Sequence, residues 1–297
     1  MEAPLGIHHN VDFETYLQWD AVSNSKLSLA ARSAAHYKQG FGDETTPALR
    51  LGSLTHCGVL EPLQLSNRYV VEPAFASMPE NVDKKGERSF SHATTFVKEA
   101  RKQFADANSR KTVVSQAEYD KVVGIATSLH KENKVRELMS FGDAEVSLVW
   151  IDDETGLTCK CRVDWLQVTF SDVLVVDLKT CRDAMRFDYA IRDYGYHRQG
   201  AFYRRGISAV LGRLSRHWLI SVEPEAPFCS RTAPVSERTL AYGDEAISKA
   251  LRLVAECKKT GVWPGYPSPD EWDLPESAMY SADEELEFGE LDTEVTF

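Results

Sequence analysis

The first half of the chain alternates between stretches with apolar residues at helical spacing and short polar stretches. Residues 26–40 carry a rough helical stripe, preceded by Ser25 at the N-cap position, and residues 47–61 carry a second one. A strand is expected at residues 68–73, and the polar residues 81–91 are typical of a loop. We therefore expect mainly helices in the N-terminal part of the fold.

A capping box marks the start of the next helix. Ser115 can accept a hydrogen bond from the backbone amide of Glu118, whose side chain can reach back to the residue 115 amide. Apolar residues at near-helical spacing continue to about Met139. The pattern predicts one helix over this range.

The remaining elements alternate between strands and helices. In chain order, we expect a hairpin of strands over 144–152 and 157–170, a third strand over 171–180, two helical segments over 183–211, a strand over 216–223 and a helix over 237–259. The central strands are too apolar for one face to be solvated. The pattern predicts an α/β core with a mixed central sheet flanked by helices.

Size and composition are consistent with one elaborated domain. The chain has 297 residues, of which 43% are hydrophobic, enough for one large core. It contains no run of about 18 apolar residues, and its N-terminus has neither a basic nor an apolar leader region. We expect a single domain over residues 1–269 with an N-terminal helical elaboration, in a soluble cytoplasmic protein with no membrane contact.

The net charge of −11 is unevenly distributed. Residues 270–297 contain eleven acidic residues and no lysine or arginine, so the rest of the chain is balanced. Such a segment is typical of a flexible, solvated tail, and the alternative is a DNA mimic or a partner-docking strip. The acidic balance therefore does not exclude a nucleic-acid substrate for the domain itself.

The six cysteines are too few for a disulfide framework, and none lies in a CxxC pair. Cys159 and Cys161 are two apart on an expected strand, so a metal site there is conceivable, but no second pair completes it. Free, mostly buried thiols are expected.

The sequence VVDLKT at residues 175–180 places two charges at the end of an apolar strand. Asp177 and Lys179 are two apart, so they share one face of the strand and stand about 6–7 Å apart. An antiparallel turn near residues 170–172 would bring Asp164 alongside Asp177. These charges are costly to bury unpaired. Spacing alone leaves two interpretations open, a buried Asp–Lys ion pair and a divalent metal site with a nearby ammonium.

Asp164 followed by Asp177-Leu178-Lys179 resembles the PD-(D/E)xK nuclease signature. Two further features resemble its RecB-like branch, namely His56 in an upstream helix and a Q-x-x-x-Y motif at Gln199 and Tyr203. Taken singly, His56 is equally consistent with a core histidine, and Gln199 and Tyr203 with an ordinary helix surface. The literal PD pair is absent, since valine precedes Asp164.

The segments AVSNSKLSLAARSAAHYKQG, GLTCKCRVDWL, VVDLKTCRDA, YGYHRQGAFYRRG and GVWPGYP resemble the exonuclease VIII (RecE-type) nuclease domain of phages and prophages over about residues 10–270. The resemblance implies a Mg²⁺-dependent exodeoxyribonuclease, with Mn²⁺ as a substitute, that degrades linear double-stranded DNA from 5′ ends in homologous recombination. It also implies a homo-oligomer such as a ring tetramer in a bacterial host cell, and a single-strand annealing protein that takes up the 3′ strand.

The resemblance also implies roles for individual residues. Asp164, Asp177 and the Leu178 carbonyl would be metal ligands, and Lys179 would orient the attacking water or help to deprotonate it. His56 would lie beside the metal, either as a direct ligand or just outside the ligands, and Glu145 is a weaker candidate for a ligand of a second ion. Gln199 and Tyr203 would hold the lysine or the DNA strand.

Weaker candidates concern DNA contacts near the site: Ser25, Lys26, Arg198, Arg204 and Arg205. The alternative is that these are solvated surface residues. Two rival functions also remain open, a structure-specific or restriction-like endonuclease with the same core and a non-catalytic DNA-binding module on the same scaffold.

Overall fold

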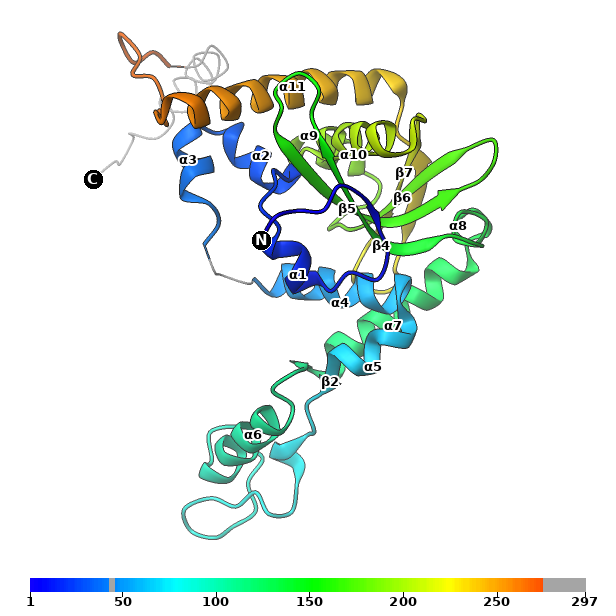
Figure 1. Ribbon diagram of the computed structural model, residues 1–297. Coiled ribbons are helices and arrows are strands. Elements are labelled where there is room, and N and C mark those ends of the chain that lie inside the picture. The colour runs from blue at the N-terminus through cyan, green and yellow to red at the C-terminus, as the bar shows by residue number, and fades with distance from the viewer. Residues whose placement is uncertain (43–45, 275–297) are drawn as a thin grey trace, which may run out of the picture.

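A six-stranded sheet forms the centre of the fold in a computed structural model that describes residues 1–42 and 46–274 (Figure 1). The strand order is β1 (Gly6–His8), β4 (Asp143–Ile151), β5 (Thr158–Val168), β6 (Val173–Thr180), β7 (Arg216–Val222) and β8 (Ser230–Pro234). Neighbouring strands are antiparallel except β6 and β7, which run parallel. The predicted α/β core with a mixed sheet and flanking helices is confirmed.

Eleven α-helices of the described residues surround this sheet, most of them before β4 in the chain and three of them after β6. They are α1 (Phe13–Gln18), α2 (Asn24–Ala30), α3 (Ala34–Gln39), α4 (Pro47–Leu60), α5 (Leu65–Arg68), α6 (Thr95–Ala107), α7 (Gln116–Lys131), α8 (Asn133–Leu138), α9 (Phe187–Asp193), α10 (Tyr196–Leu211) and α11 (Glu237–Thr260), with short 3₁₀ turns at Pro62–Gln64 and Phe75–Ser77. Within the described ranges, none of these helices is long and apolar enough to cross a lipid bilayer.

The sheet is covered on both faces. One face packs its apolar side chains against α2, α10 and α11, with Phe202 and Ile207 of α10 fully buried there. The other face packs against α7 and α8 through Ile125 and Leu129 of α7. Burial on both faces explains why the central strands carry nearly continuous apolar runs.

At one point along strands β4 and β5, the side chains switch from one face of the sheet to the other. Val163 packs in the cluster that contains α10, whereas Trp165 packs in the cluster that contains α7, although residues two apart usually share a face. Glu145 on β4 lies between the pairs Ala144–Trp165 and Val146–Val163, and its φ is 55°. A non-glycine residue rarely adopts this left-handed conformation. The twist occurs at Glu145 and at Asp164, the residue that faces it.

The chain between β2 (Tyr69–Val71) and β3 (Thr112–Val114), residues 72–111, forms a projection that we call the arm (Figure 1). The two strands are parallel neighbours at its base. Its small core contains Phe75, Val97 and Phe104, and it includes α6. The loop predicted at residues 81–91 is confirmed, but the sequence analysis missed α6.

Other local predictions need correction. The helix expected over residues 26–40 is two helices, α2 and α3, and Ser23 rather than Ser25 is the N-cap of α2. The capping box of Ser115 and Glu118 is confirmed, but the helix breaks at Glu132 between α7 and α8. Strands β1 and β8 and helix α1 were not predicted.

The acidic tail predicted at residues 270–297 lies largely outside the described residues, which end at 274. Its flexibility therefore stays a prediction.

Candidate active site

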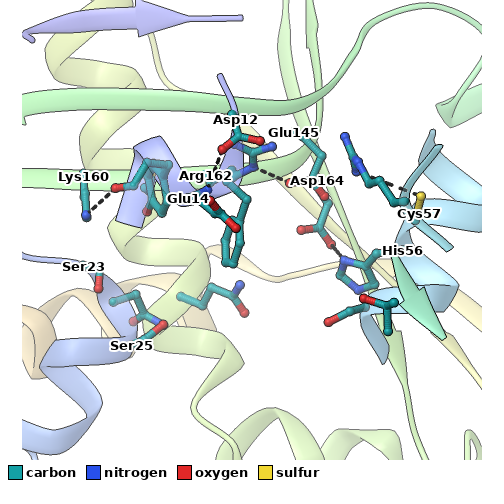
Figure 2. Close-up of a pocket in the computed structure, with 18 of the residues that line it drawn as sticks. Asp12, Glu14, Ser23, Ser25, His56, Cys57, Glu145, Lys160, Arg162 and Asp164 are labelled. Carbon is teal, nitrogen blue, oxygen red and sulfur yellow. Dashed lines mark hydrogen bonds and ion pairs between the residues drawn. The ribbon is translucent and has the colours of Figure 1, made fainter. Parts of the chain in front are cut away.

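A cavity of about 600 Å³ opens between the N-terminal helices, the sheet and the base of the arm. It is lined from α1 and α2 by Phe13 and Ser25, from α4 by His56, and from the sheet by Asp164, among others. Figure 2 shows His56 and Asp164 pointing toward each other inside it, with Glu145 above them. The cavity thus brings together residues that are more than 100 positions apart in the sequence.

His56 of α4, Glu145 of β4 and Asp164 of β5 form a compact group of metal-ligating side chains. One ligand atom from each residue lies within 4.8 Å of the others. Glu145 and Asp164 come together because they face each other where the two strands turn over. The group contains two of the predicted ligands and the predicted second-ion candidate.

The hydrogen bonds of His56 fix the tautomer of its ring. Nε2 lies 2.7 Å from the carbonyl oxygen of Leu178, and a carbonyl can only accept, so Nε2 carries the proton. Nδ1 lies 3.6 Å from Oδ2 of Asp164. Burial, and then the charge of Lys179, lower the pKa of His56, which favours the neutral ring. Nδ1 therefore directs a lone pair toward the carboxylate.

The lone pair of His56 and the carboxyl groups of Glu145 and Asp164 converge in a partly buried space. Arg162 pairs with Glu145, whereas Asp164 has no lysine or arginine in an ion pair among the described residues, so Asp164 needs a proton or a cation. Burial and the nearby charge of Asp177 raise the pKa of Asp164, which reflects the cost of leaving its charge uncompensated. Two hard carboxylate oxygens and one imidazole nitrogen suit a divalent ion that keeps waters in its other positions. The residues present therefore fit a divalent metal ion.

Asp164 also holds the backbone of the neighbouring strand. The β5–β6 ladder ends at Trp165–Val176, and beyond it Oδ2 of Asp164 accepts a 2.8 Å hydrogen bond from the amide of Leu178. The backbone of Leu178 is thus held on both sides, its amide by Asp164 and its carbonyl by His56. The Leu178 carbonyl was predicted to be a metal ligand, but here it accepts the His56 hydrogen bond.

Asp177 and Lys179 form a close ion pair on β6, with 2.5 Å between Oδ2 and Nζ. The Asp177 side chain is fully buried and that of Lys179 is 13% exposed. The ammonium also lies 5.1 Å from the centre of the Tyr196 ring. Burial lowers the pKa of Lys179, but the charges of Asp177 and Asp164 outweigh it, so the pKa is raised and the amine stays protonated.

Gln199 and Tyr203 of α10 extend this chain of contacts. Nε2 of Gln199 donates to Oδ1 of Asp177 at 3.3 Å and to the hydroxyl of Tyr203 at 2.7 Å. The Q-x-x-x-Y pair therefore holds Asp177, which in turn holds Lys179. Of the two roles predicted for the pair, the contacts support holding the lysine, through Asp177 rather than directly.

Of the two interpretations left open for the charged strand end, the Asp–Lys ion pair is present, and a candidate ion site lies close to it. Asp177 uses its two oxygens for Lys179 and Gln199, and it lies outside the group of His56, Glu145 and Asp164. That Asp164 and Asp177 jointly hold one ion stays a prediction, and in this structure Asp177 is paired with Lys179. Asp164 shares the candidate ion site with Glu145, and Asp177 positions the ammonium beside it.

Arg162, which the sequence analysis did not single out, supports this group from β5. Its Nε lies 2.5 Å from Oε2 of Glu145, and one terminal nitrogen donates to the Val11 carbonyl at 2.7 Å. Its guanidinium lies 5.7 Å from the centre of the Phe13 ring. The signal in the sequence was its position two residues before Asp164, on the same strand.

The residues predicted to contact DNA differ in where they lie relative to the cavity. Ser25 lines the cavity, whereas Lys26 and Arg198 are not among its lining residues. Arg204 pairs with Glu237, and Arg205 pairs with Asp244, both on α11. These two arginines border a separate groove between α10 and α11, so the structure does not bring them to the candidate site.

The contacts from Gln199 to Asp177, and from Asp177 to Lys179, lead to a specific prediction. Gln199→Ala should lower kcat about 10–100-fold with KM changed less than about threefold, because Asp177 and Lys179 lose a fixed partner. The measurement is steady-state hydrolysis of labelled duplex DNA. Gln167→Ala is the matched control, since Gln167 is buried away from the cavity and donates to a backbone carbonyl, that of Leu138. Equal effects of the two variants on kcat would contradict a positioning role.

His217, on β7 behind Tyr203, makes stability depend on pH. Its ring is buried, neither nitrogen has a hydrogen-bond partner among the described residues, and burial lowers its pKa to about 4. The unfolded chain, with a histidine pKa of about 6.5, binds more protons between these values, so stability falls as pH falls through that window. From pH 7.5 to 5.0 this group should remove about 2 kcal/mol. Urea unfolding at both values should show that loss, and His217→Phe should lack it.

The model of a PDDEXK-like domain of unknown function (DUF3799) matches residues 21–269. No curated protein matches the chain. A crystal structure described as "Putative exonuclease" from Eubacterium rectale shares 16% identity with a TM-score of 0.54, over 97% of each chain. That likeness concerns the fold.

A second solved structure, SSO0001, shares 16% identity over 45% of this chain and 60% of its own, with a TM-score of 0.27, too low to support an argument. The family match covers most of the chain, including His56, Asp164, Asp177 and Lys179. It confirms the PD-(D/E)xK fold predicted from the sequence. The chain belongs to the family of the PDDEXK-like domain of unknown function (DUF3799).

Proposed function

We propose that the protein is a metal-dependent nuclease, and more specifically an exodeoxyribonuclease that degrades linear double-stranded DNA, from 5′ toward 3′ ends, with Mg²⁺. The observation that carries the proposal is the convergence of His56, Glu145 and Asp164 in the cavity. The ammonium of Lys179, held by Asp177, is near enough for its charge to act on His56 and Asp164. Membership of the PD-(D/E)xK fold supports the nuclease class.

The chemistry that a divalent ion supplies in such a site is stabilisation of charge on the scissile phosphate and a lowered pKa of bound water. His56, Glu145 and Asp164 would hold it. Mg²⁺ fits because two of the three donors are hard carboxylates and because Mg²⁺ keeps several waters that a phosphate can replace. Imidazole as the third donor also makes Mn²⁺ a fitting substitute.

Lys179 donates hydrogen bonds at the site. It is ion-paired with Asp177, so it is an ammonium, and an ammonium can orient water or offset phosphate charge but cannot accept a proton. Of the two roles left open by the sequence, this contact supports the orienting one. Asp177 and Gln199 keep the ammonium in one place, so less reorganisation is needed during the reaction.

The test uses three substrates with and without Mg²⁺: a linear duplex labelled at its 5′ ends, the same duplex labelled at its 3′ ends, and a covalently closed circular duplex. The proposal predicts early release of the 5′ label as short products, late loss of the 3′ label and no cutting of the circle. Cutting of the circle would instead support the endonuclease alternative. Binding of DNA without any hydrolysis would support the non-catalytic module.

The remaining features implied by the exonuclease VIII resemblance stay predictions. These are a ring-shaped homo-oligomer, a single-strand annealing partner and a role in homologous recombination. An enclosing ring would keep a domain with no net charge on its DNA. Mass measurement in solution and pull-down with annealing proteins address them separately from the activity.

A further inference from the structure

We propose that the arm, residues 72–111, binds the phosphate backbone of duplex DNA beyond the site of hydrolysis. This inference deepens the proposed function, since it assigns the surface that holds the DNA. It rests on the charge of the arm, on the absence of internal partners for that charge, and on the position of the arm at the cavity. Sequence-independent phosphate contacts need no more than mobile cations on an accessible surface.

The arm differs in charge from the rest of the domain. Residues 72–111 contain eight lysines and arginines against six acidic residues, a net charge of +2, whereas the remainder of residues 1–269 has a net charge of −2. The cavity is lined by four acidic residues and four basic ones, so its lining has no net charge. Of the four bases, Arg68, Lys160 and Arg162 are held by contacts within the chain. Attraction for the phosphates of a duplex is therefore expected mainly from a surface that extends beyond the cavity.

Seven cations of the arm are exposed and make no ion pair with a described residue. Two of them have other contacts, since Arg88 lies against Phe90 and Lys111 donates to the Ser66 carbonyl. We call the other five the arm cations, and they are Lys84, Lys85, Lys98, Lys102 and Arg110. Among the arm's lysines and arginines, Arg101 alone forms an ion pair, with Glu72. In the body, by contrast, twelve of the remaining basic residues are in ion pairs with carboxylates of the described chain.

The fold presents the arm cations on ordered elements. Lys84 and Lys85 lie at the tip of a turn in which Asp83 accepts from the amides of Lys85 and Glu87. Asn81, fully buried, ties this turn to the arm through the Ala76 and Ser91 carbonyls. Lys98 and Lys102 are four apart on α6, so they share one helix face. Like charges at this spacing repel, and an anionic partner would relieve that repulsion.

The base of the arm is part of the wall of the cavity. Tyr69 and Thr112, which pair across β2 and β3, line it together with Arg110 and the candidate ligands. In Figure 1 the arm extends away from the body at this base. A duplex whose end enters the cavity would therefore continue past the arm, and Arg110 stands where the two surfaces meet.

The composition of the arm favours the duplex backbone over unpaired bases. Binding of single strands uses exposed aromatic side chains on which bases stack. Among the arm's described residues, Phe90 is an exposed aromatic at 65%, and the guanidinium of Arg88 lies 5.1 Å from the centre of its ring. Long lysine side chains without interleaved free aromatics are suited to phosphates.

The test compares two variants that lose the same charge. In the arm variant, Lys84, Lys85, Lys98 and Lys102 become glutamine. In the control, the four exposed lysines of α7 and α11, namely Lys131, Lys249, Lys258 and Lys259, become glutamine. Fluorescence anisotropy with a 30-base-pair duplex is measured in EDTA from 50 to 300 mM NaCl, and circular dichroism confirms folding of both variants.

The arm variant should bind at least about 10-fold more weakly than wild type, and its slope of log Kd against log salt should fall by about 2–4, because each phosphate contact contributes about 0.9. The control should stay within about threefold of wild type. Equal losses in both variants, or unchanged binding by the arm variant, would overturn the proposal.

Hydrolysis is measured separately with Mg²⁺, where the arm variant should raise KM and leave kcat within about twofold. If wild type shows no hydrolysis but the arm effect on binding persists, the proposed function fails while the arm assignment stands. If hydrolysis is normal and the arm effect on binding is absent, the proposed function stands and the arm assignment fails.

Discussion

Lys179→Ala is expected to lower kcat for duplex hydrolysis at least about 1000-fold, with Kd for DNA within about threefold of wild type. The ammonium lies beside the candidate ion group and contributes where charge develops, whereas the rest of the DNA contacts remain. The measurement is single-turnover hydrolysis with Mg²⁺, together with anisotropy in EDTA.

The same substitution should also destabilise the fold by about 3–5 kcal/mol, because Asp177 is left buried without its partner. Lys179→Arg separates the two effects. It keeps the charge for Asp177 but displaces the donor, so its unfolding free energy should stay within about 1 kcal/mol of wild type while kcat still falls about 100-fold. Full activity of Lys179→Arg would show that the position of the amine is unimportant, and activity of Lys179→Ala would refute the site assignment.

The second large effect is expected at the candidate ion site. Asp164→Asn should weaken Mn²⁺ binding at least about 10-fold and lower kcat at least about 1000-fold, because one of two carboxylate ligands is lost. Glu145→Gln should weaken Mn²⁺ binding in the same direction. Isothermal titration with Mn²⁺ reports the affinity without reference to activity.

Asp152→Asn is the matched control for that measurement. Asp152 is 6% exposed and Asp164 is 7% exposed, and both lie in or beside the β4–β5 hairpin. Asp152 contacts Arg205 and Thr155 rather than the cavity. An Asp152→Asn variant should bind Mn²⁺ as wild type does. If it loses the ion as strongly as Asp164→Asn, the effect is a general loss of buried charge.

The parts of the site that follow from local periodicity could be predicted from the sequence. Asp177 and Lys179 share a strand face because the period of a strand is two, and they form the expected pair. Gln199 and Tyr203 share a helix face because four residues make about one turn, and their side chains are in contact. The central strands could be placed because burial on both faces gives nearly continuous apolar runs.

Contacts between distant segments could not be derived in the same way. The hydrogen bond from His56 to the Leu178 carbonyl spans 122 residues, and the spacing of either segment says nothing about it. The role of Glu145 depends on its left-handed backbone conformation, at which the side chains of β4 change face, and no sequence pattern indicates this conformation. Helix α6 was missed because it buries few apolar residues, with Val97 fully buried and Phe104 partly so.

That Arg204 and Arg205 lie away from the candidate site could have been predicted from the sequence. At 3.6 residues per turn they lie about 100° and 200° around the helix from Tyr203, so they cannot share the face that Gln199 and Tyr203 direct toward Asp177. In the structure they pair instead with Glu237 and Asp244 on α11. Helical geometry alone therefore argues against both residues as contacts near the site.

The most direct test of the central claim, that His56, Glu145 and Asp164 together bind a divalent ion, is an anomalous difference map from crystals soaked in Mn²⁺. The account predicts a peak within coordination distance of Nδ1 of His56 and of both carboxylates, and its loss in Asp164→Asn crystals. A map with no peak in this cavity, or with a peak bound by other residues, would contradict it.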